Sequence, residues 1–211
     1  MTPPSAAGPM DMIGDDAGTF IVATGNPHKL AEITAVLGDR FRLTPLPPGA
    51  SEVVETARSL RGNARLKATA ARALTGLPAL SDDTGLYINV LGGRPGPKAA
   101  RFAGRAGSYA EAIRALLAEL RDVPPRERGA RFTTCAVAAL PDGEEVVAYG
   151  TLRGRIAGHP RGSRGFGYDS IFIPDAGCGR TLAEASDADR LALSHRAHAF
   201  RRLAARMKET Q

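Results

Sequence analysis

The stretch SDDTGL, residues 81–86, places two adjacent carboxylates, a hydroxyl and a glycine between two apolar runs. The run before it is LPAL (77–80), and the run after it, LYINV (86–90), has apolar residues at every second position, which is the period of a strand. The pattern predicts that Asp82 and Asp83 lie at a strand end. Two carboxylates at the edge of a buried sheet suit Mg²⁺, which prefers carboxylate oxygens. The same letters also fit an Asp-Asp-x-Gly turn, and both interpretations stay open at this point.

Composition and charge limit the classes of partner. Lys and Arg number 28 against 22 Asp and Glu, a formal net charge of +6 that admits nucleic acid, anionic lipid or a polyphosphate. No apolar run approaches the roughly 20 residues that span a bilayer, so no membrane partner is expected. Residues 1–18 lack periodicity and are expected to be a disordered tail. Cys135 and Cys178 lack zinc-site spacing, and free thiols favour a cytoplasmic location.

A second motif, TGNPHK (24–29), follows the short apolar stretch TFIVA (19–23). Asn26 is a good N-cap and Pro27 suits the first helical position, so the pattern predicts a strand, a tight turn and a helix start. Free backbone N–H groups at a helix N-terminus attract anions, and Lys29 would add a positive charge. The turn is therefore either a phosphate site or an ordinary strand-to-helix connection.

A second helix is expected from about Leu60 to Leu74. Within it Asn63 and Lys67 are four residues apart and share a face, so an amide and an ammonium project together. Alanines on the adjoining face predict close packing on a sheet. Glu55 precedes this helix and is a further candidate metal ligand.

The remaining pattern predicts the fold class. Residues 131–140 and 145–150 form an expected antiparallel hairpin, whereas residues 41–51 and 92–104 are typical of connections. An antiparallel pair beside strand-helix units implies an α/β fold with a mixed central sheet and flanking helices.

Two further segments carry candidate binding residues. The glycine-rich run 158–169 holds Phe166 and Tyr168, whose rings either stack on a nucleobase or fill the core. A final helix is expected from about 187 to 207, with His195 and Arg196 pointing away from its apolar stripe.

Taken together, six stretches in this order resemble the inosine triphosphate pyrophosphatase family, which hydrolyses non-standard purine nucleoside triphosphates. They are TGNPHK (24–29), Glu55 with GNARLKA (62–68), SDDTGL (81–86), LGGRPGPKAARFAG (91–104), GFGYD (165–169) and SHR (194–196). The resemblance covers roughly residues 19–207 and implies one pyrophosphatase domain, residues 19–211, with two lobes around a nucleotide cleft. It also implies a homodimer, Mg²⁺, and conversion of ITP, dITP or XTP to the monophosphate and pyrophosphate.

The resemblance implies a role for each matching residue. Metal ligands would be Glu55, Asp82 and Asp83, and the catalytic residues would be Asp83, as the base that activates water, and Lys67. Substrate contacts at the triphosphate end would come from Thr24, Gly25, Asn26, Lys29, Asn63, Lys67 and Thr84. Substrate contacts towards the base would come from Phe166, Gly167, Tyr168, Asp169, Arg190, His195 and Arg196.

Two chemical expectations follow from these roles. Donors on His195 and Arg196 would meet the 6-oxo group of inosine or xanthine but the amino group of adenine, and such a polar mismatch discriminates strongly. Repulsion from Asp82 would raise the pKa of Asp83 and a metal would lower it, and the sequence leaves that balance open. Gly62 stands where many relatives have Glu, and Arg190 where Lys is usual, which changes the donor geometry.

Two alternatives compete with this hypothesis. The first is a related nucleotide-pool pyrophosphatase with another modified nucleotide as substrate. The second is a basic nucleic-acid-binding module, which would leave Asp82 and Asp83 unexplained; no stable nucleic-acid partner is therefore expected.

Overall fold

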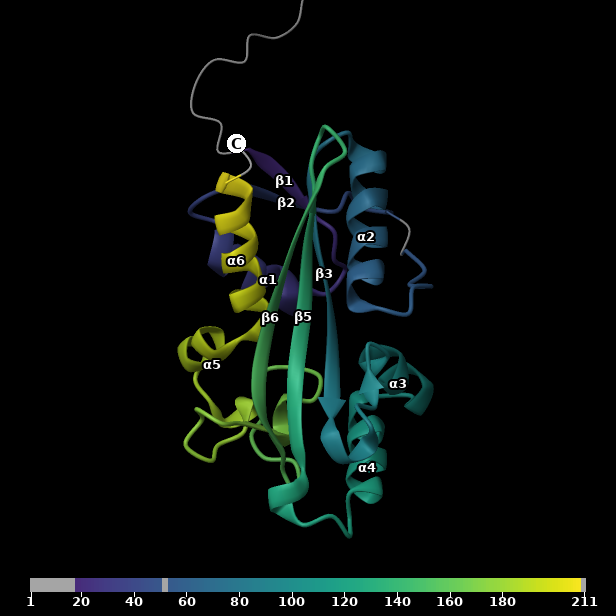
Figure 1. Ribbon diagram of the computed structural model, residues 1–211, viewed down its shortest axis with the longest axis vertical. Helices are drawn as coiled ribbons and strands as arrows, with labels where there is room; N and C mark the ends of the chain where they lie inside the picture. Colours follow the sequence, from purple (N-terminus) through teal and green to yellow (C-terminus); the bar gives the residue numbers. More distant parts are fainter. Residues whose placement is uncertain (1–17, 51–52, 210–211) are drawn as a thin grey trace, which may run out of the picture.

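A mixed sheet of seven strands forms the spine of the molecule (Figure 1). The computed structural model describes residues 18–50 and 53–209, so the predicted tail, apart from Gly18, lies outside the described residues. The strand order is β2-β1-β3-β5-β6-β7, with β4 paired beside β3. β1 pairs in parallel with β2 and β3, and the other pairings are antiparallel. The strands are β1 (Thr19–Val22), β2 (Arg42–Pro45), β3 (Ala79–Ile88), β4 (Pro95–Gly96), β5 (Gly129–Ala139), β6 (Glu145–Ile156) and β7 (Phe172–Pro174).

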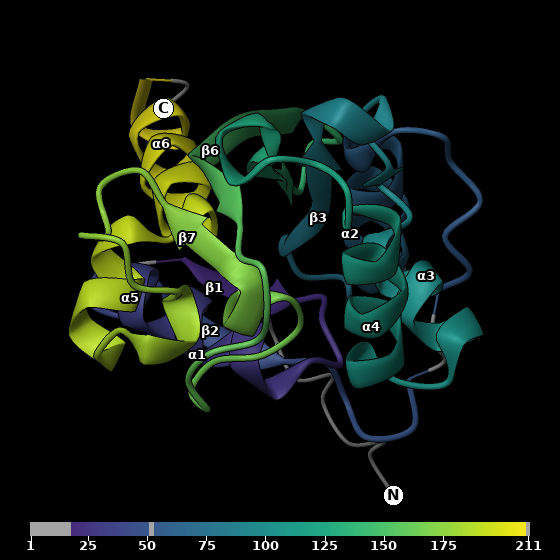
Figure 2. The same cartoon turned by 90° about the horizontal axis from the view of Figure 1, so that it is seen from below.

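Helices cover both faces of this sheet. The α-helices are α1 (Pro27–Leu37), α2 (Leu60–Thr75), α3 (Ala99–Ala106), α4 (Tyr109–Glu119), α5 (Asp187–Leu193) and α6 (His195–Glu209), and single 3₁₀ turns span Asn89–Leu91, Pro125–Glu127, Asp169–Ile171 and Leu182–Glu184. Figure 2 shows α1, α5 and α6 on one side of the sheet and α2, α3 and α4 on the other. The predicted α/β class with a mixed sheet is confirmed.

The long strands β3, β5 and β6 connect two lobes that have separate apolar cores. In the upper lobe of Figure 1, α1 and α6 pack on one sheet face through side chains such as Ile33 and Phe200. The small residues Ala64 and Ala68 of α2 pack on the other face, as expected. In the lower lobe, α3 and α4 pack with β7 in a core that includes Phe172.

Helix caps place the first two helices where the sequence predicts them. The Oδ1 atom of Asn26 accepts hydrogen bonds from the backbone N–H groups of His28 and Lys29, at 2.9 and 3.3 Å. The Ser59 side chain accepts from the N–H of Gly62, and α2 ends at Gly76, whose φ of 72° is in the left-handed region. Both helix starts are confirmed because local capping determines them.

The acidic pair lies inside a strand, so the predicted strand end and the alternative turn are both wrong. β3 continues through Asp82 and Asp83 because β5 pairs with all its residues from 79 to 88. The glycine at position 85 does not form a turn; it allows β3 and β4 to approach each other closely, since a Cβ there would lie 2.9 Å from the backbone of Gly96. Val90, expected on the buried face of the strand, follows β3 in a 3₁₀ turn and is 47% exposed.

Three other sequence expectations need correction. The connection 41–51 contains β2, and the connection 92–104 contains β4 and most of α3. The final helix is two helices, because the chain leaves the helical conformation at Ser194, with ψ of 123°. The Ser194 hydroxyl then accepts hydrogen bonds from the N–H groups of Arg196 and Ala197, which starts α6 at the very residues predicted to bind the base.

Within the described ranges, the structure contains no helix with the length and apolar character needed to cross a membrane.

Candidate active site

The acidic pair occupies a stretch of β3 that has no strand beside it on one edge. On that edge β1 pairs only with Ala79 and Leu80, and β4 pairs only with Leu86 and Tyr87. Among the described residues, no strand fills the interval from 81 to 85 on this side. The interval therefore faces loops and helix ends, where a ligand can approach the strand.

Asp82 and Asp83 are neighbours on the strand and point to opposite faces of the sheet. Asp82 faces α1 and α6, where its Oδ2 atom accepts from Lys29 Nζ at 3.0 Å and from Arg196 Nε at 3.1 Å. Burial alone would raise the pKa of Asp82, but the charges of Lys29 and Arg196 outweigh burial and hold that pKa well below its usual range. Asp82 is therefore an ionised carboxylate between two cations.

Asp83 faces α2. Its Oδ2 atom accepts from Asn63 Nδ2 at 3.0 Å, and on the same helix Lys67 Nζ donates to Glu55 Oε1 at 2.7 Å. Burial, with a smaller contribution from Glu55, raises the pKa of Asp83 to about 6 against the opposing effect of Lys67 and Asn63. The expected cause, repulsion from Asp82, is not the main one; Asp82 faces the other side of the sheet. The pKa of Asp83 therefore lies close to neutral pH, which suits a general base.

A cavity of about 690 Å³ collects most of the residues predicted for the triphosphate end, although Asn63 and Thr84 are not part of its lining. Its lining includes the loop Thr24-Gly25-Asn26, Lys29, Glu55 and Lys67. The loop joins β1 to α1, and the Thr24 hydroxyl accepts from the N–H of Asn26 at 3.1 Å. The cavity therefore combines a helix N-terminus with two lysines, an arrangement that binds anions.

A second, smaller hollow collects residues predicted for the base end. Its lining includes Phe166, Asp169, Arg190, His195 and Arg196. The Phe166 ring stacks on His28 with 5.0 Å between centroids and an angle of 9° between planes. Burial raises the pKa of Asp169 to about 6, and its Oδ2 atom accepts from the N–H of Phe166 at 3.0 Å. Arg190 donates to Asp187 at 2.9 Å, while its buried Nη1 atom makes no hydrogen bond within the described part of the chain.

Arg196 lines the smaller hollow and is linked to the larger cavity through Asp82, which also accepts from Lys29. Besides Asp82, its guanidinium donates from Nη1 to Glu32 Oε2 at 2.9 Å and from Nη2 to Thr84 Oγ1 at 3.3 Å. It also lies over the Phe166 ring, 5.7 Å from the centroid. One side chain thus contacts α1, β3 and the glycine-rich loop, which fixes the position of the base end relative to Asp82.

Comparison with known proteins identifies this arrangement. The Ham1 family model matches residues 20–206, almost the entire described chain. The chain belongs to the Ham1 family. It is 43% identical over 189 residues to the dITP/XTP pyrophosphatase of Symbiobacterium thermophilum, covering 89% of this chain and 94% of that protein.

Two solved structures share the fold. The nucleoside-triphosphatase, or dITP/XTP pyrophosphatase, of Mycobacterium abscessus has a TM-score of 0.71 at 43% identity, covering 89% of this chain and 98% of its own. The Staphylococcus aureus Ham1 protein has a TM-score of 0.80 at 30% identity, covering 92% of this chain and 100% of its own. The resemblance inferred from the six sequence stretches is confirmed at the level of the family.

Most predicted residues of this Ham1 protein converge, but Tyr168 does not. Its ring is buried in the lower-lobe core, edge-on to Tyr109, and its hydroxyl donates to the carbonyl oxygen of Ala99. Of the two roles considered for the aromatic residues, Tyr168 fills the core and Phe166 borders the base end. Gly167, between them, has a φ of 65°, which lets the chain turn one ring inward and leave the other in the hollow.

Sequence reasoning missed two residues of the site, Glu32 and Thr134. Glu32 accepts from Arg196 and from the hydroxyl of Ser194, and it lies three residues after Lys29 on the same face of α1. That spacing was an available signal. Thr134 is buried on β5, and its hydroxyl contacts Thr84 and His195. Both partners are distant in the sequence, so no local pattern reveals Thr134.

The position of Gly62 also has a structural explanation. A Cβ at this residue would lie 2.5 Å from Cβ of Ala57 and 3.2 Å from the hydroxyl of Ser59. In this chain the glycine lets the segment before α2 pack tightly against the helix start. A Glu at position 62 would require that segment to move.

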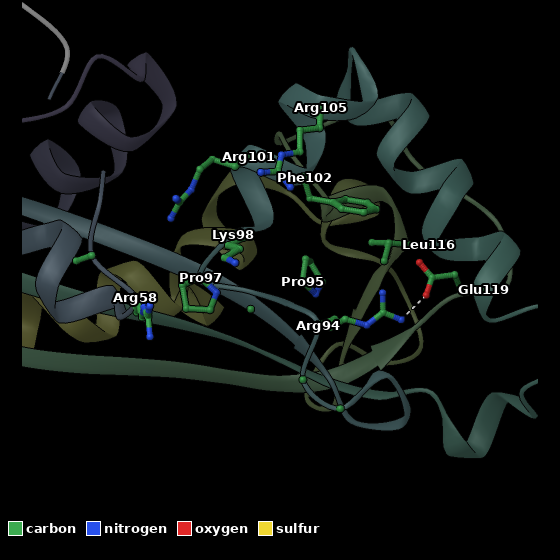
Figure 3. Close-up of a pocket in the computed structure, with 14 residues that line it drawn as sticks. Arg58, Arg94, Pro95, Pro97, Lys98, Arg101, Phe102, Arg105, Leu116 and Glu119 are labelled. Carbon is green, nitrogen blue, oxygen red and sulfur yellow. Dashed lines mark hydrogen bonds and ion pairs between the residues drawn. The ribbon is translucent and has the colours of Figure 1, made fainter. Parts of the chain in front are cut away.

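A separate basic hollow of about 710 Å³ lies beside α3 (Figure 3). Arg58, Lys98, Arg101 and Arg105 line it together with Arg94, which pairs with Glu119 at 2.5 Å. Its described lining contains none of the predicted site residues. Because Ala100 lines the triphosphate-end cavity and Arg101 lines this hollow, α3 places positive charge next to the site.

Proposed function

We propose that this Ham1 protein hydrolyses the non-standard purine nucleoside triphosphates dITP, ITP and XTP to the monophosphate and pyrophosphate. The observation that carries the proposal is the pairing of two hollows through Asp82 and Arg196. The larger cavity has the two lysines and the helix N-terminus that suit a triphosphate. The residues around the smaller hollow supply the ring and the donors that suit a purine, and this hollow, with a volume of about 20 Å³, must open to admit the base. Clearing deaminated purines from the nucleotide pool would be the biological result.

Asp83 is the proposed general base. A pKa of about 6 leaves its carboxylate largely ionised at neutral pH yet basic enough to take a proton from water. Asn63 holds one of its oxygens, and the backbone N–H of Thr84 donates to the other at 2.9 Å. These two donors orient the carboxylate towards the attacking water.

Lys29 and Lys67 are the proposed electrostatic partners of the triphosphate. Negative charge builds up on the transferred phosphate and on the leaving pyrophosphate, and cations that offset it supply much of the catalysis in phosphoryl transfer. Lys67 keeps a raised pKa because Asp82, Asp83 and Glu55 outweigh its burial. Lys29 is fixed by its ion pair with Asp82, so both ammonium groups are placed before the substrate binds.

Mg²⁺ is the proposed cofactor, and the residues present fit it. Within the described ranges there is no cluster of three or more His, Cys, Asp or Glu side chains that could hold a metal ion. A magnesium site whose ligands all come from the protein is therefore not expected. Magnesium is commonly held by one or two carboxylates plus substrate phosphates and water. Glu55 and Asp83 would supply those carboxylates, while Asp82 already neutralises Lys29 and Arg196. The bound ion would offset phosphate charge.

Selection of the base is proposed to depend on Arg196 and His195. Three of the five guanidinium N–H groups of Arg196 are engaged, which leaves donors for a 6-oxo group. Phe166 would cover the face of the purine. The resemblance to the family also supports a homodimer, and the free thiols Cys135 and Cys178 are consistent with the cytoplasm; sedimentation velocity tests the dimer.

A nucleotide panel tests the proposed function. Pyrophosphate release is measured for ITP, dITP, XTP, dUTP, ATP and GTP, with Mg²⁺ and with a chelator. We expect rapid release from ITP, dITP and XTP, slow release from ATP, and none after chelation; Arg196 and His195 alone do not exclude GTP, which has the same 6-oxo group. Inosine diphosphate and free phosphate as first products would refute cleavage between the α and β phosphates, and preference for dUTP would favour the alternative pyrophosphatase.

A further inference from the structure

A continuous chain of side chains joins Asp82 to His195 through two threonine hydroxyls. The Thr84 hydroxyl lies 3.2 Å from Oδ2 of Asp82 and 2.7 Å from the hydroxyl of Thr134. The Thr134 hydroxyl lies 2.6 Å from Nδ1 of His195. Thr134 has no exposed surface, so water does not take part at this link.

The direction of these hydrogen bonds follows from the ionised carboxylate. Asp82 contacts two cations and can only accept. Each hydroxyl has a single proton, so a Thr84 hydroxyl that donates to Asp82 must accept from Thr134. Thr134 must then accept from His195, which requires the proton of that imidazole on Nδ1. The opposite direction would turn the oxygen lone pairs of Thr84 towards the carboxylate, which is unfavourable in a buried site.

The imidazole is held in place as a neutral ring. His195 is 8% exposed and stacks on Phe132 with 4.9 Å between ring centroids. Burial, with the adjacent charge of Arg196, holds the pKa of His195 well below its ordinary value. A neutral imidazole with a proton on Nδ1 has a lone pair on Nε2, and within the described residues the only hydrogen bond of this ring is the one at Nδ1.

We propose that Thr134 is a positioning residue for base selection: it keeps His195 in the Nδ1–H form, so that Nε2 accepts a hydrogen bond from N1–H of a 6-oxopurine. The inference rests on the proposed function, because it assigns one contact within that base pocket. It also replaces the earlier expectation that His195 donates to the 6-oxo group.

The proposed pair reads two adjacent positions of the purine. Hypoxanthine and xanthine present an acceptor at position 6 and a donor at N1, which match a donor on Arg196 and an acceptor on His195. Adenine presents the reverse order, so both contacts with adenine would fail. Buried polar groups left unpaired by the wrong substrate are the strongest source of discrimination in such a pocket.

Two variants test the role of the hydroxyl. Thr134→Val removes it with little change in volume, and Thr134→Ser restores it. We expect Thr134→Val to lower the ratio of kcat/KM for ITP to kcat/KM for ATP by roughly 10- to 100-fold, the effect of a lost hydrogen bond in a buried site. Thr134→Ser should keep the ratio within about 3-fold of the wild type. Thr133→Val is the control, because this neighbouring hydroxyl pairs with Thr151 at a more exposed position.

The protonation of the ring is measured without any substrate. Nitrogen-15 NMR of histidine-labelled protein, assigned with His195→Gln, distinguishes a protonated ring nitrogen from an unprotonated one. We expect Nδ1 protonated and Nε2 unprotonated in the wild type and in Thr134→Ser, and a mixture of tautomers in Thr134→Val.

A wild-type ring with the proton on Nε2 would overturn the inference, even if Thr134→Val fails to fold. So would an unchanged ITP to ATP ratio in a folded Thr134→Val, or an equal loss of the ratio in Thr134→Ser. A wild-type enzyme that hydrolyses none of ITP, dITP and XTP would instead refute the proposed function, and the NMR result would still stand for the hydrogen-bond chain.

Discussion

Asp82 and Arg196 form a buried ion pair, with 3.1 Å between Oδ2 and Nε, although 114 residues separate them in the sequence. Lys29 donates to the same oxygen atom. Each of these cations belongs to a different end of the proposed substrate site, the triphosphate end for Lys29 and the base end for Arg196. The carboxylate therefore joins α1 and α6 to β3 and keeps the two ends in register.

Asp82→Asn should strongly destabilise the fold. It leaves Lys29 and Arg196 with a neutral partner in a buried site, and breaking a buried ion pair costs about 3 kcal/mol or more. Urea unfolding measures the free energy, and Asp122→Asn, at an exposed position, is the control. A loss below about 1 kcal/mol would show that Asp82 does not hold these cations together.

Asp83→Asn should abolish turnover and leave the fold intact. Loss of a general base lowers the rate by about 100-fold or more, and Asn can still accept the hydrogen bond from Asn63. Pyrophosphate release measures the first effect and circular dichroism the second. Wild-type activity in this variant would remove Asp83 as the base.

The same variant has a predicted pH signature. Because burial raises the pKa of Asp83 to about 6, the folded state keeps the proton of this carboxyl up to a higher pH than the unfolded state does. The stability from this group is present below about pH 4 and is lost as the pH rises through about 6. Measured in chelator, wild-type stability should decline by about 2 kcal/mol more than that of Asp83→Asn between pH 4 and 8. An equal decline in both proteins would contradict the raised pKa.

Lys67→Ala should weaken triphosphate binding and shift the pH profile. Its ammonium group lies 2.7 Å from Glu55, and its charge lowers the pKa of Asp83, so its removal should move the acid limb of kcat/KM to higher pH. A lost hydrogen bond to a charged group lowers kcat/KM by about 10- to 100-fold. Arg65→Ala on the same helix is the control, because Arg65 pairs with Glu145 and is 63% exposed.

Local signals account for what the sequence predicts well. Asn26 and Pro27 fix the start of α1, and the four-residue spacing of Asn63 and Lys67 fixes their common face on α2. Asp82 is different. Strand alternation separates it from Asp83, but only the packing of α1 and α6 on the same face gives it two cations. The break at Ser194 was missed for a similar reason, since Ser194 caps α6 and also donates to Glu32 on a distant helix.

Gly150→Ala should disturb the base end by displacing α6, which packs directly on this residue. A Cβ at this residue of β6 would lie 2.0 Å from the carbonyl oxygen of His195 and 2.5 Å from the backbone nitrogen of Ala199, so α6 would have to move outward. Overpacking of this kind costs about 1 to 3 kcal/mol, and the shift would displace His195 and Arg196 from the base pocket. We expect a lower thermal midpoint and a higher KM for ITP. The inhibition constant of the product pyrophosphate, which binds at the Lys67 end, should rise less than this KM.

Gly104→Ala is the matched control, because its Cβ would meet no atom within 4 Å and alanine favours the helix by up to about 1 kcal/mol. An unchanged thermal midpoint and KM in Gly150→Ala would show that α6 does not depend on this close contact with β6.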